Sequence, residues 1–236
     1  MFWVMFQSLD MKLSNPVWKG KNHLDINEIL RGGATAFRKK IEEYSLTIFC
    51  FEQSLKGALV LGSLDKSTDS WFQGNPEEKV RYGISRIRKT AEAAAALDVS
   101  VVNGFISSPN WGSWFIYPLV NEQIYEEGFQ LFLSDGERFF DFFNKYNIKF
   151  ALEVRPQEHA YNIETAKRLL EVVNYNKAFG FNFNPSHFVW QLIDPVVFIK
   201  IFADRIFHCH AKDGELVKEN LSTSGCVSTG SWQQSG

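Results

Sequence analysis

Three apolar stretches of the sequence, residues 148–154, 178–187 and 205–213, each end in side chains that can hold a metal ion. These side chains are Glu153 in the first stretch, Asn184 and His187 in the second, and His208 and His210 in the third. A mixed set of carboxylate, amide and imidazole ligands suits Mn²⁺, and also Mg²⁺, Co²⁺ or Zn²⁺. The spacing therefore predicts one metal centre that is assembled from three separate segments.

The segments that carry these residues have the composition of buried parallel strands. Strands covered on both faces read as near-continuous apolar runs, as IKFAL and RIFHC do. In a βα barrel, the catalytic groups lie at the C-terminal ends of such strands. We expect His208 and His210 to face opposite sides of their strand, with His210 directed into the barrel. Asn184 precedes Pro185, so it is either a metal ligand or only a turn residue.

Strands and helices alternate along the chain, which predicts a parallel α/β sheet with six strands. The expected strands are residues 1–6, 46–51, 99–106, 148–154, 178–183 and 205–210. The expected helices are residues 24–44, 76–97, 124–146, 162–173 and 194–202, the first of them with a break at Gly32 and Gly33. Asn75 and Asp194 are each followed by proline, which is typical of a capped helix start.

Two long loops separate the early elements. Residues 52–76 are rich in Gly, Ser and Asp, and residues 107–120 carry several aromatic side chains, including Trp111. Trp111 either contacts a sugar substrate or packs in the core beneath its loop. Residues 216–236 have no hydrophobic period, so we expect one domain over residues 1–215 and a flexible loop or tail after it.

The composition indicates an ordinary folded protein, with 236 residues of which 45% are hydrophobic and 22% are charged. A net charge of −2 gives no electrostatic reason to bind nucleic acid or an anionic membrane. No apolar stretch approaches 18 residues, so no transmembrane helix is expected. The three cysteines have no motif spacing, which disfavours a disulfide framework and makes a cytoplasmic location the expectation.

Over residues 151–213 the sequence resembles the sugar phosphate isomerase/epimerase family, whose fold is a xylose isomerase-like (β/α)8 TIM barrel. The resemblance is carried by ALEVRPQEHAYNIETAKRLLE, FGFNFNPSHFVWQLIDPVVFI and DRIFHCHAKD, in this order and at this spacing. It implies a divalent-metal-dependent enzyme that moves a proton beside a carbonyl group through an enediolate intermediate. The implied partner is a small sugar or sugar phosphate, with no nucleic acid and no membrane.

The resemblance also implies roles for individual residues. The implied metal ligands are Glu153, Asn184 and His210, the implied catalytic residues are Glu153, His187 and Lys212, and the implied substrate contacts are His187, Lys212, Arg155 and Trp111. Glu153 would act both as a metal ligand and as the first base. His187 would contact a substrate oxygen, and Lys212 would hold an anionic or hydroxyl group.

Three departures from the family pattern bear on activity. Asn184 stands where the family usually has aspartate, which removes one negative charge and predicts weaker metal binding. Arg155 stands where relatives often have histidine. The family's first and eighth βα units find no match, so we expect an incomplete barrel of about six units, without the glutamate of the eighth strand.

These departures leave a second hypothesis open, in which the chain is a catalytically inactive barrel fragment that binds a ligand or a partner. Metal-dependent DNA repair on the same type of barrel is a third hypothesis, which the negative net charge disfavours. An incomplete barrel has two free strand edges, so association into a homo-oligomer through these edges is a further expectation.

Overall fold

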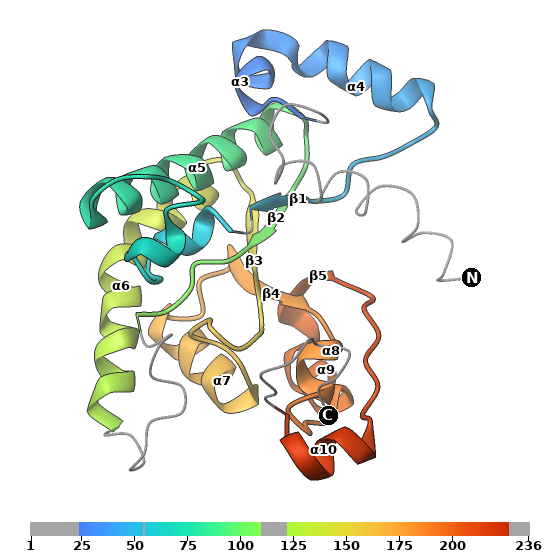
Figure 1. The fold of residues 1–236 in the computed structure, drawn as a ribbon. Helices are drawn as coiled ribbons and strands as arrows, with labels where there is room; N and C mark the ends of the chain where they lie inside the picture. Colours follow the sequence, from blue (N-terminus) through green and yellow to red (C-terminus); the bar gives the residue numbers. More distant parts are fainter. Residues whose placement is uncertain (1–23, 54, 110–121, 227–236) are drawn as a thin grey trace.

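The computed structural model describes residues 24–53, 55–109 and 122–226, and its centre is a sheet of five parallel strands (Figure 1). The strands are β1 (Phe51–Gln53), β2 (Val101–Gly104), β3 (Lys149–Glu153), β4 (Phe179–Phe183) and β5 (Ile206–Cys209). Each strand pairs with the next one along the chain. The predicted parallel α/β sheet is confirmed, whereas the strand expected at residues 1–6 lies outside the described residues.

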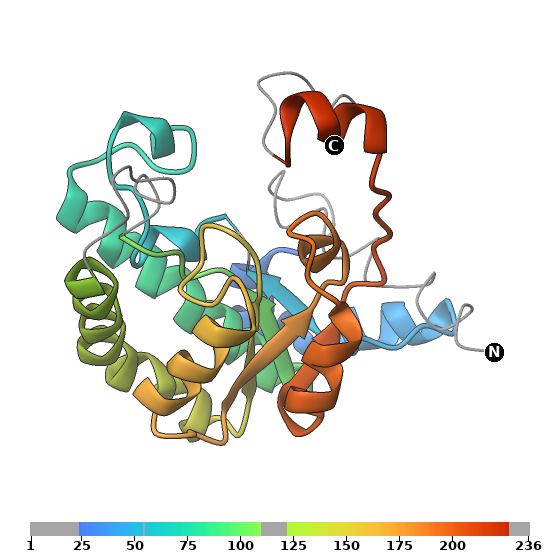
Figure 2. The same cartoon turned by 90° about the horizontal axis from the view of Figure 1, so that it is seen from below.

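Helices follow the strands in alternation and lie around the sheet (Figure 2). They are α3 (Ile26–Glu28), α4 (Ala34–Glu43), α5 (Pro76–Ala96), α6 (Glu122–Lys145), α7 (Ile163–Val172), α8 (Ser186–Val189), α9 (Pro195–Phe202) and α10 (Lys218–Ser224). The helices α5, α6, α7 and α9 each join two neighbouring parallel strands, as in a βα barrel. In the described ranges, no helix has the length and hydropathy needed to cross a membrane.

Several helix boundaries follow from local signals in the sequence. At the start of α5, Asn75 accepts a hydrogen bond from the Glu78 backbone N–H, and the Glu78 carboxylate accepts one from the Asn75 N–H. Asp194 caps α9 ahead of Pro195 in the expected way. The chain kinks at Gly32, whose φ of 107° suits glycine, so the predicted break in the first helical segment is confirmed.

Local predictions differ from the structure at three places. The strand expected at residues 46–51 begins only at Phe51. Within the described residues, the pairing of β1 with β2 begins at Phe51, which lies opposite Val102. Two short turns of 3-10 helix interrupt the expected loop 52–76. The helix α10 lies within the segment 216–236, where a loop or tail was expected.

The strand β4 divides its side chains between the helix layer and the barrel interior. The outward-facing residues are Phe179, Phe181 and Phe183. The ring of Phe181 lies 5.5 Å from that of Phe198 and 5.2 Å from that of Phe202, between ring centroids. Alternate residues of a strand point to the opposite face. The inward-facing residues are therefore Gly180, Asn182 and, just beyond the strand, Asn184.

A β-bulge in β5 changes which of its side chains face the interior. Phe181 of β4 pairs with Ile206. The next β4 residue, Asn182, pairs with His208, so Phe207 is an extra residue in β5. Because one additional residue reverses the alternation of side chains, His208 lies on the same face as Asn182.

Gly180 makes room for this bulge. A Cβ atom at position 180 would come within 2.5 Å of a ring carbon of Phe207 and would also collide with the Arg205 carbonyl oxygen. Only glycine leaves the Phe207 ring in its place above β4. The bulge and the glycine therefore form one structural unit.

Lys79 in α5 has a buried ammonium group that holds residues 64–69 against the helix. The Nζ atom donates to the carbonyl oxygens of Leu64 (3.2 Å) and Asp65 (2.6 Å), to Thr68 Oγ1 (3.1 Å) and to Asp69 Oδ1 (2.6 Å). The Lys79 side chain is 1% exposed, whereas the Asp69 side chain is 43% exposed. The loop after β1 is thus fixed to α5 by one cation and four oxygen atoms.

Candidate functional site

Glu153, the last residue of β3, is the centre of a buried polar cluster at the C-terminal ends of three strands. Four side-chain nitrogen atoms surround its carboxylate. His187 Nε2 and Asn184 Nδ2 each lie 2.9 Å from Oε1, whereas His210 Nδ1 lies 3.3 Å and Asn182 Nδ2 lies 3.4 Å from Oε2. Asn184 follows β4 directly, His187 lies in α8, and His210 follows β5. The structure therefore brings together four of the residues that the sequence placed at a metal centre.

The surroundings of Glu153 keep its carboxylate ionised. Burial alone would raise the pKa of Glu153, but hydrogen bonds and charge interactions with His187 and His210 outweigh burial and hold the pKa well below its usual range. At neutral pH the side chain is thus a buried anion with hydrogen-bond donors on both oxygen atoms. Such a group has the charge that a metal ligand needs.

Two buried asparagines extend the cluster towards β2. Asn103 in β2 is 1% exposed, and its Nδ2 lies 3.0 Å from His210 Nε2. Asn182 is fully buried, and its Nδ2 lies 3.4 Å from Glu153 Oε2. The strands β2 and β5 are three positions apart, which is about 14 Å in a flat sheet. The contact between Asn103 and His210 therefore requires the curvature of a barrel.

The sequence reasoning missed both asparagines. Asn182 could have been found, because it precedes Asn184 by two residues and so lies on the same face of the strand. Asn103 had only the weak signal of a polar residue inside an apolar run. It pairs in register with Glu52 of β1, which therefore belongs to the same face of the sheet.

Asn184 makes the turn interaction that was one of its two alternatives, and it also contacts Glu153. Its Nδ2 donates to Glu153, whereas its Oδ1 accepts hydrogen bonds from Ser186 Oγ (2.8 Å) and the Ser186 N–H (3.3 Å). The second pair of bonds is a local turn interaction of the kind that asparagine favours. In this arrangement the amide nitrogen of Asn184, and not its amide oxygen, faces the Glu153 carboxylate.

The prediction that His208 and His210 face opposite sides of their strand is wrong. Residues two positions apart lie on the same face of a strand, and the bulge at Phe207 turns that face inward. The two imidazole rings lie 5.2 Å apart, centroid to centroid, with an interplanar angle of 89°. His210 reaches Glu153, as expected, but His208 is its neighbour and does not face the helix layer.

Two further predicted site residues, Lys212 and Arg155, lie outside the cluster around Glu153. Lys212 is exposed in the segment after β5. The Arg155 guanidinium donates to Gln157 Oε1 (2.6 Å) and stacks over the Phe105 ring, with 4.6 Å between Cζ and the ring centroid. Trp111 lies outside the described residues. The substrate contacts assigned to these three side chains stay predictions.

A family profile described as the xylose isomerase-like TIM barrel matches residues 16–227 of the chain. The chain belongs to this family. Among known proteins it is similar to the uncharacterized protein YfiH of Bacillus subtilis (strain 168), with 22% identity over 223 residues, which cover 93% of this chain and 69% of that protein. The family predicted from the sequence is thereby confirmed.

Solved structures with the xylose isomerase-like fold superpose on most of the chain. A xylose isomerase domain protein from Planctomyces limnophilus has a TM-score of 0.54 and 16% identity, over 83% of this chain and 63% of that chain. The 3-keto-D-glucoside 4-epimerase YcjR from E. coli has a TM-score of 0.58 and 15% identity, over 84% of this chain and 72% of that chain. This chain thus spans about two thirds of the length of these proteins, and its described residues form an incomplete barrel.

The cluster of this xylose isomerase-like protein fits a divalent cation by the type of its donor atoms. The Glu153 carboxylate and the His210 imidazole are suitable ligands, and rotation of the Asn184 carboxamide would add an oxygen atom. Among the residues that the structure describes, no group of three or more His, Cys, Asp or Glu side chains is arranged to hold a metal ion. An amide ligand would therefore have to complete the set, and a single carboxylate predicts weak affinity.

A second buried acid of this family member, Glu158, joins the loops that follow β2 and β3. Its Oε2 accepts hydrogen bonds from the N–H groups of Ile106 (3.1 Å) and Ser107 (2.7 Å). The neighbouring His159 has Nδ1 2.7 Å from the Ser107 carbonyl oxygen and Nε2 2.9 Å from the Gly128 carbonyl oxygen. Burial raises the pKa of Glu158 to about 8 and lowers that of His159 to about 4.

We expect the free energy of unfolding to decrease as the pH rises from 6.5 to 8. Glu158 binds its proton more tightly in the folded state than in the unfolded state, so its contribution is complete below about 4.5 and is lost as the pH approaches 8. His159 acts in the opposite direction, but only below its ordinary pKa of 6.5. Urea denaturation across this range should show a loss of about 2 kcal/mol. Glu158→Gln should flatten the profile, whereas the exposed control Glu164→Gln should leave it unchanged; an unaltered slope in Glu158→Gln would contradict the assignment.

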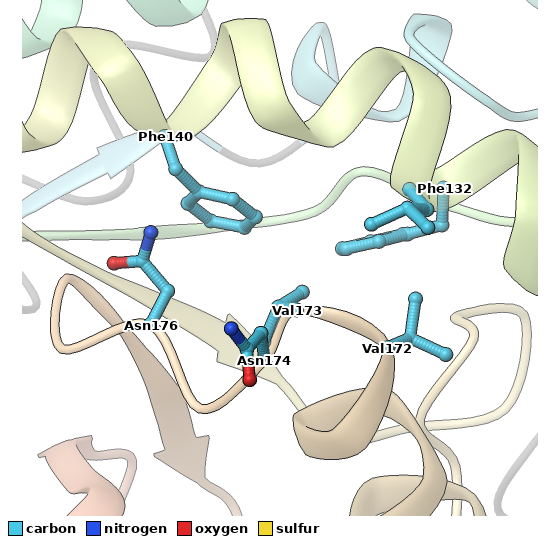
Figure 3. A pocket seen from close by; sticks show the side chains of 7 residues that line it. Phe132, Phe140, Val172, Val173, Asn174 and Asn176 are labelled. Atoms are coloured by element: carbon cyan, nitrogen blue, oxygen red, sulfur yellow. The ribbon is translucent and has the colours of Figure 1, made fainter.

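One cavity of about 220 Å³ lies on the outer side of the barrel, between α6 and α7 (Figure 3). Its lining residues are Phe132, Leu133, Phe140, Val172, Val173, Asn174 and Asn176. These residues belong to α6, to the end of α7 and to the segment that follows α7. The cavity belongs to the packing of the helix layer.

Proposed function

We propose that this protein is a divalent-metal-dependent isomerase or epimerase of a sugar or sugar phosphate. The observation that carries the proposal is the convergence of Asn184, His187 and His210 on the buried carboxylate of Glu153. These residues lie at the C-terminal ends of barrel strands, where enzymes of this architecture place their chemistry. Similarity in fold to a 3-keto-D-glucoside 4-epimerase supports the same class of reaction.

In the proposed mechanism, Glu153, His210 and the Asn184 carboxamide would hold the cation, with Mn²⁺ preferred. When bound, a divalent cation polarises a carbonyl group and stabilises the enediolate that forms when the neighbouring C–H group loses its proton. Glu153 is ionised at neutral pH, so it would also be the first acceptor of that proton. The low pKa of Glu153 makes it a better ligand than base.

Substrate would be bound by residues nearer to the solvent. The His187 side chain is 18% exposed, against 7% for Glu153, so His187 is the member of this pair that a sugar hydroxyl group can reach. Lys212 is exposed and would hold a hydroxyl or phosphate group. Arg155 and Trp111 are proposed as further substrate contacts.

A second candidate function is ligand binding without catalysis. The observation that favours it is the orientation of Asn184, whose carboxamide oxygen faces Ser186 and not the cluster. A site in this state has one charged ligand and would bind a cation or a sugar weakly. The two functions are distinguished by proton exchange, because a binding protein takes up the sugar without exchanging its C–H proton.

The setting of the protein is also proposed. In the described part of the chain, Cys50, Cys209 and Cys226 form no disulfide, which is the usual state in the cytoplasm. In the described sheet β5 has a neighbour on one side only, and α9 exposes several apolar side chains. We propose that a second copy of the chain covers these surfaces, which would give the homo-oligomer expected from the sequence.

The test of this proposal is metal-dependent exchange of a sugar proton, compared between the wild-type protein and Asn184→Asp. In D₂O with Mn²⁺ and a ketose, NMR should show slow uptake of deuterium beside the carbonyl group, and EDTA should abolish it. Asn184→Asp should bind Mn²⁺ more tightly in calorimetry, by roughly tenfold, because it adds a charged ligand. Without metal the same variant should be less stable, since two carboxylates then face each other at the distance of the present hydrogen bond.

Two results would count against the proposal. Binding of a sugar without any deuterium uptake would favour the second candidate function. Equal Mn²⁺ affinity of the wild-type protein and Asn184→Asp would remove Asn184 from the ligand set.

A further inference from the structure

Glu52 of β1 points into the barrel, on the same side of the sheet as Glu153. Both neighbours of Glu52 face the helix layer: Phe51 is part of the hydrophobic core, and Gln53 Oε1 accepts a hydrogen bond of 2.8 Å from Thr90 Oγ1 in α5. Because alternate residues of a strand point to opposite faces, Glu52 faces inward. The residue is only partly buried, so its carboxyl group is open to a bound molecule.

The height of an inward-facing residue along the barrel axis follows from the strand register and the strand tilt. In an eight-stranded barrel of this family the strands tilt by about 36°, and alternate strands contribute the side chains of one layer. A step across two strands covers about 10 Å. At this tilt, the layer therefore shifts by about 7 Å along the second strand, which corresponds to about two residues.

The step from β3 to β5 shows the direction of this shift. Glu153 pairs with Asn182, and Asn182 pairs with His208. His210 follows two residues after His208, and its Nδ1 lies 3.3 Å from Glu153 Oε2. Glu153 and His210 therefore belong to one layer, and the shift runs towards the C-terminal ends of the strands.

The same step from β1 to β3 places Glu52 in this layer. Glu52 pairs with Asn103, and Asn103 pairs with Ala151. Glu153 follows two residues after Ala151. Glu52, Glu153 and His210 therefore come from alternate strands, and all three face one space at the C-terminal end of the barrel.

The two carboxyl groups of this layer lie on different sides of that space. In the described ranges, no three His, Cys, Asp or Glu side chains are arranged to hold one metal ion, so Glu52 does not share a cation with Glu153 and His210. The strands β1 and β3 are two positions apart, which is about 10 Å in a flat sheet. A small molecule that contacts Glu153 thus has a second carboxyl group across from it.

We propose that Glu52 is a catalytic residue that exchanges a proton with the sugar on the face opposite to Glu153, which makes the reaction an epimerisation. The inference rests on the proposed function. Glu153 takes the proton as the C–H bond breaks, and the electron pair of that bond enters the enediolate. The carboxylic acid group of Glu52 gives its proton to the opposite face of the same carbon, so a new C–H bond forms and the carbonyl group returns. Exchange with water then restores the protonation of both carboxyl groups.

The test measures deuterium uptake and epimer formation by NMR in D₂O with Mn²⁺. The probes are D-fructose and D-allulose, which differ only in configuration at C3, beside the carbonyl group. In Glu52→Gln only Glu153 can take a proton, so C3 of one probe should still exchange at close to the wild-type rate. Exchange at C3 of the other probe, and epimer formation from both, should fall by at least roughly 100-fold, as expected for loss of a positioned acid or base.

Two further variants separate the charge of Glu52 from its size. Glu52→Asp retains the acid on a shorter side chain, and epimer formation should fall more than exchange of the favoured probe. Glu43→Gln removes an exposed carboxylate of α4 and should behave as the wild-type protein. Circular dichroism shows whether each variant folds. If Glu52→Gln does not fold, Glu52→Asp decides, because an equal fall in both rates, or no fall, would overturn the proposal.

The remaining outcomes distinguish this inference from the proposed function. An equal loss of exchange for both probes in Glu52→Gln would show that Glu52 only binds the sugar, and epimer formation at the wild-type rate would show that it has no role; either result overturns the inference. Exchange without epimer formation in the wild-type protein also overturns it but leaves the proposed function intact. Absence of exchange with both probes in the wild-type protein would remove the proposed function, and the role of Glu52 with it.

Discussion

Replacing Glu153 by glutamine is expected to lower the affinity for Mn²⁺ by at least roughly 100-fold. Loss of a group that only supports a metal ligand typically lowers affinity 10- to 100-fold, and in the proposed site Glu153 is the charged ligand itself. The substitution preserves the size of the side chain. It removes the carboxylate that the side-chain nitrogens of His187, Asn184 and His210 contact. Calorimetric titration of protein freed of metal with a chelator measures the effect.

The same substitution should also lower stability in the absence of metal. The NH₂ group of the glutamine would face other hydrogen-bond donors, so at least one buried hydrogen bond would be lost. This loss should lower the free energy of unfolding by about 1–3 kcal/mol. Glu215→Gln, an exposed position, removes the same charge and serves as the control. Wild-type affinity in Glu153→Gln would show that the cation binds elsewhere.

Replacing Lys79 by methionine is expected to destabilise the fold by about 3 kcal/mol, the lower end for breaking a buried ion pair because Asp69 is partly exposed. Methionine fills the channel of the lysine side chain but donates no hydrogen bond. The two carbonyl oxygens and the Thr68 hydroxyl group would then lose their buried donor. In a domain of this size, the melting temperature should fall by roughly 6–12 °C.

The exposed lysine of the same loop provides a matched control. Lys66→Met makes the same chemical change in the 3-10 turn 66–68, where the side chain is exposed, and should change stability by less than about 0.5 kcal/mol. Equal losses in the two variants, measured by urea denaturation, would show that the buried cation has no special role.

Much of the fold was accessible from the sequence because the long helices and the apolar strands have strong local signals. Long helices such as α5 and α6 have clear hydrophobic periods, and Asn75 and Asp194 mark helix starts with a capping side chain. The short helices α8 and α10 have too few residues to display a period. Strand ends were less accurate, because a strand extends only as far as its neighbour, as the late start at Phe51 shows.

The candidate site was accessible only in part. Glu153, Asn184 and His210 were identified from their positions at the ends of apolar runs, and the structure places them together. The bulge that orients β5 has no local signature, because it is defined by pairing with another strand. Asn103 is separated from His210 by 107 residues, and only the curvature of the sheet brings the two together.

The cluster around Glu153 depends on Gly180, although glycine has no side chain that could take part in a reaction. Any larger residue at this position would push Phe207 away, and β5 could relieve the collision by sliding one place along β4. Such a slip would exchange the imidazoles for their apolar neighbours while every proposed ligand in the sequence remained unchanged. Random mutagenesis scored by loss of cation uptake should therefore recover position 180 as readily as the proposed ligands themselves.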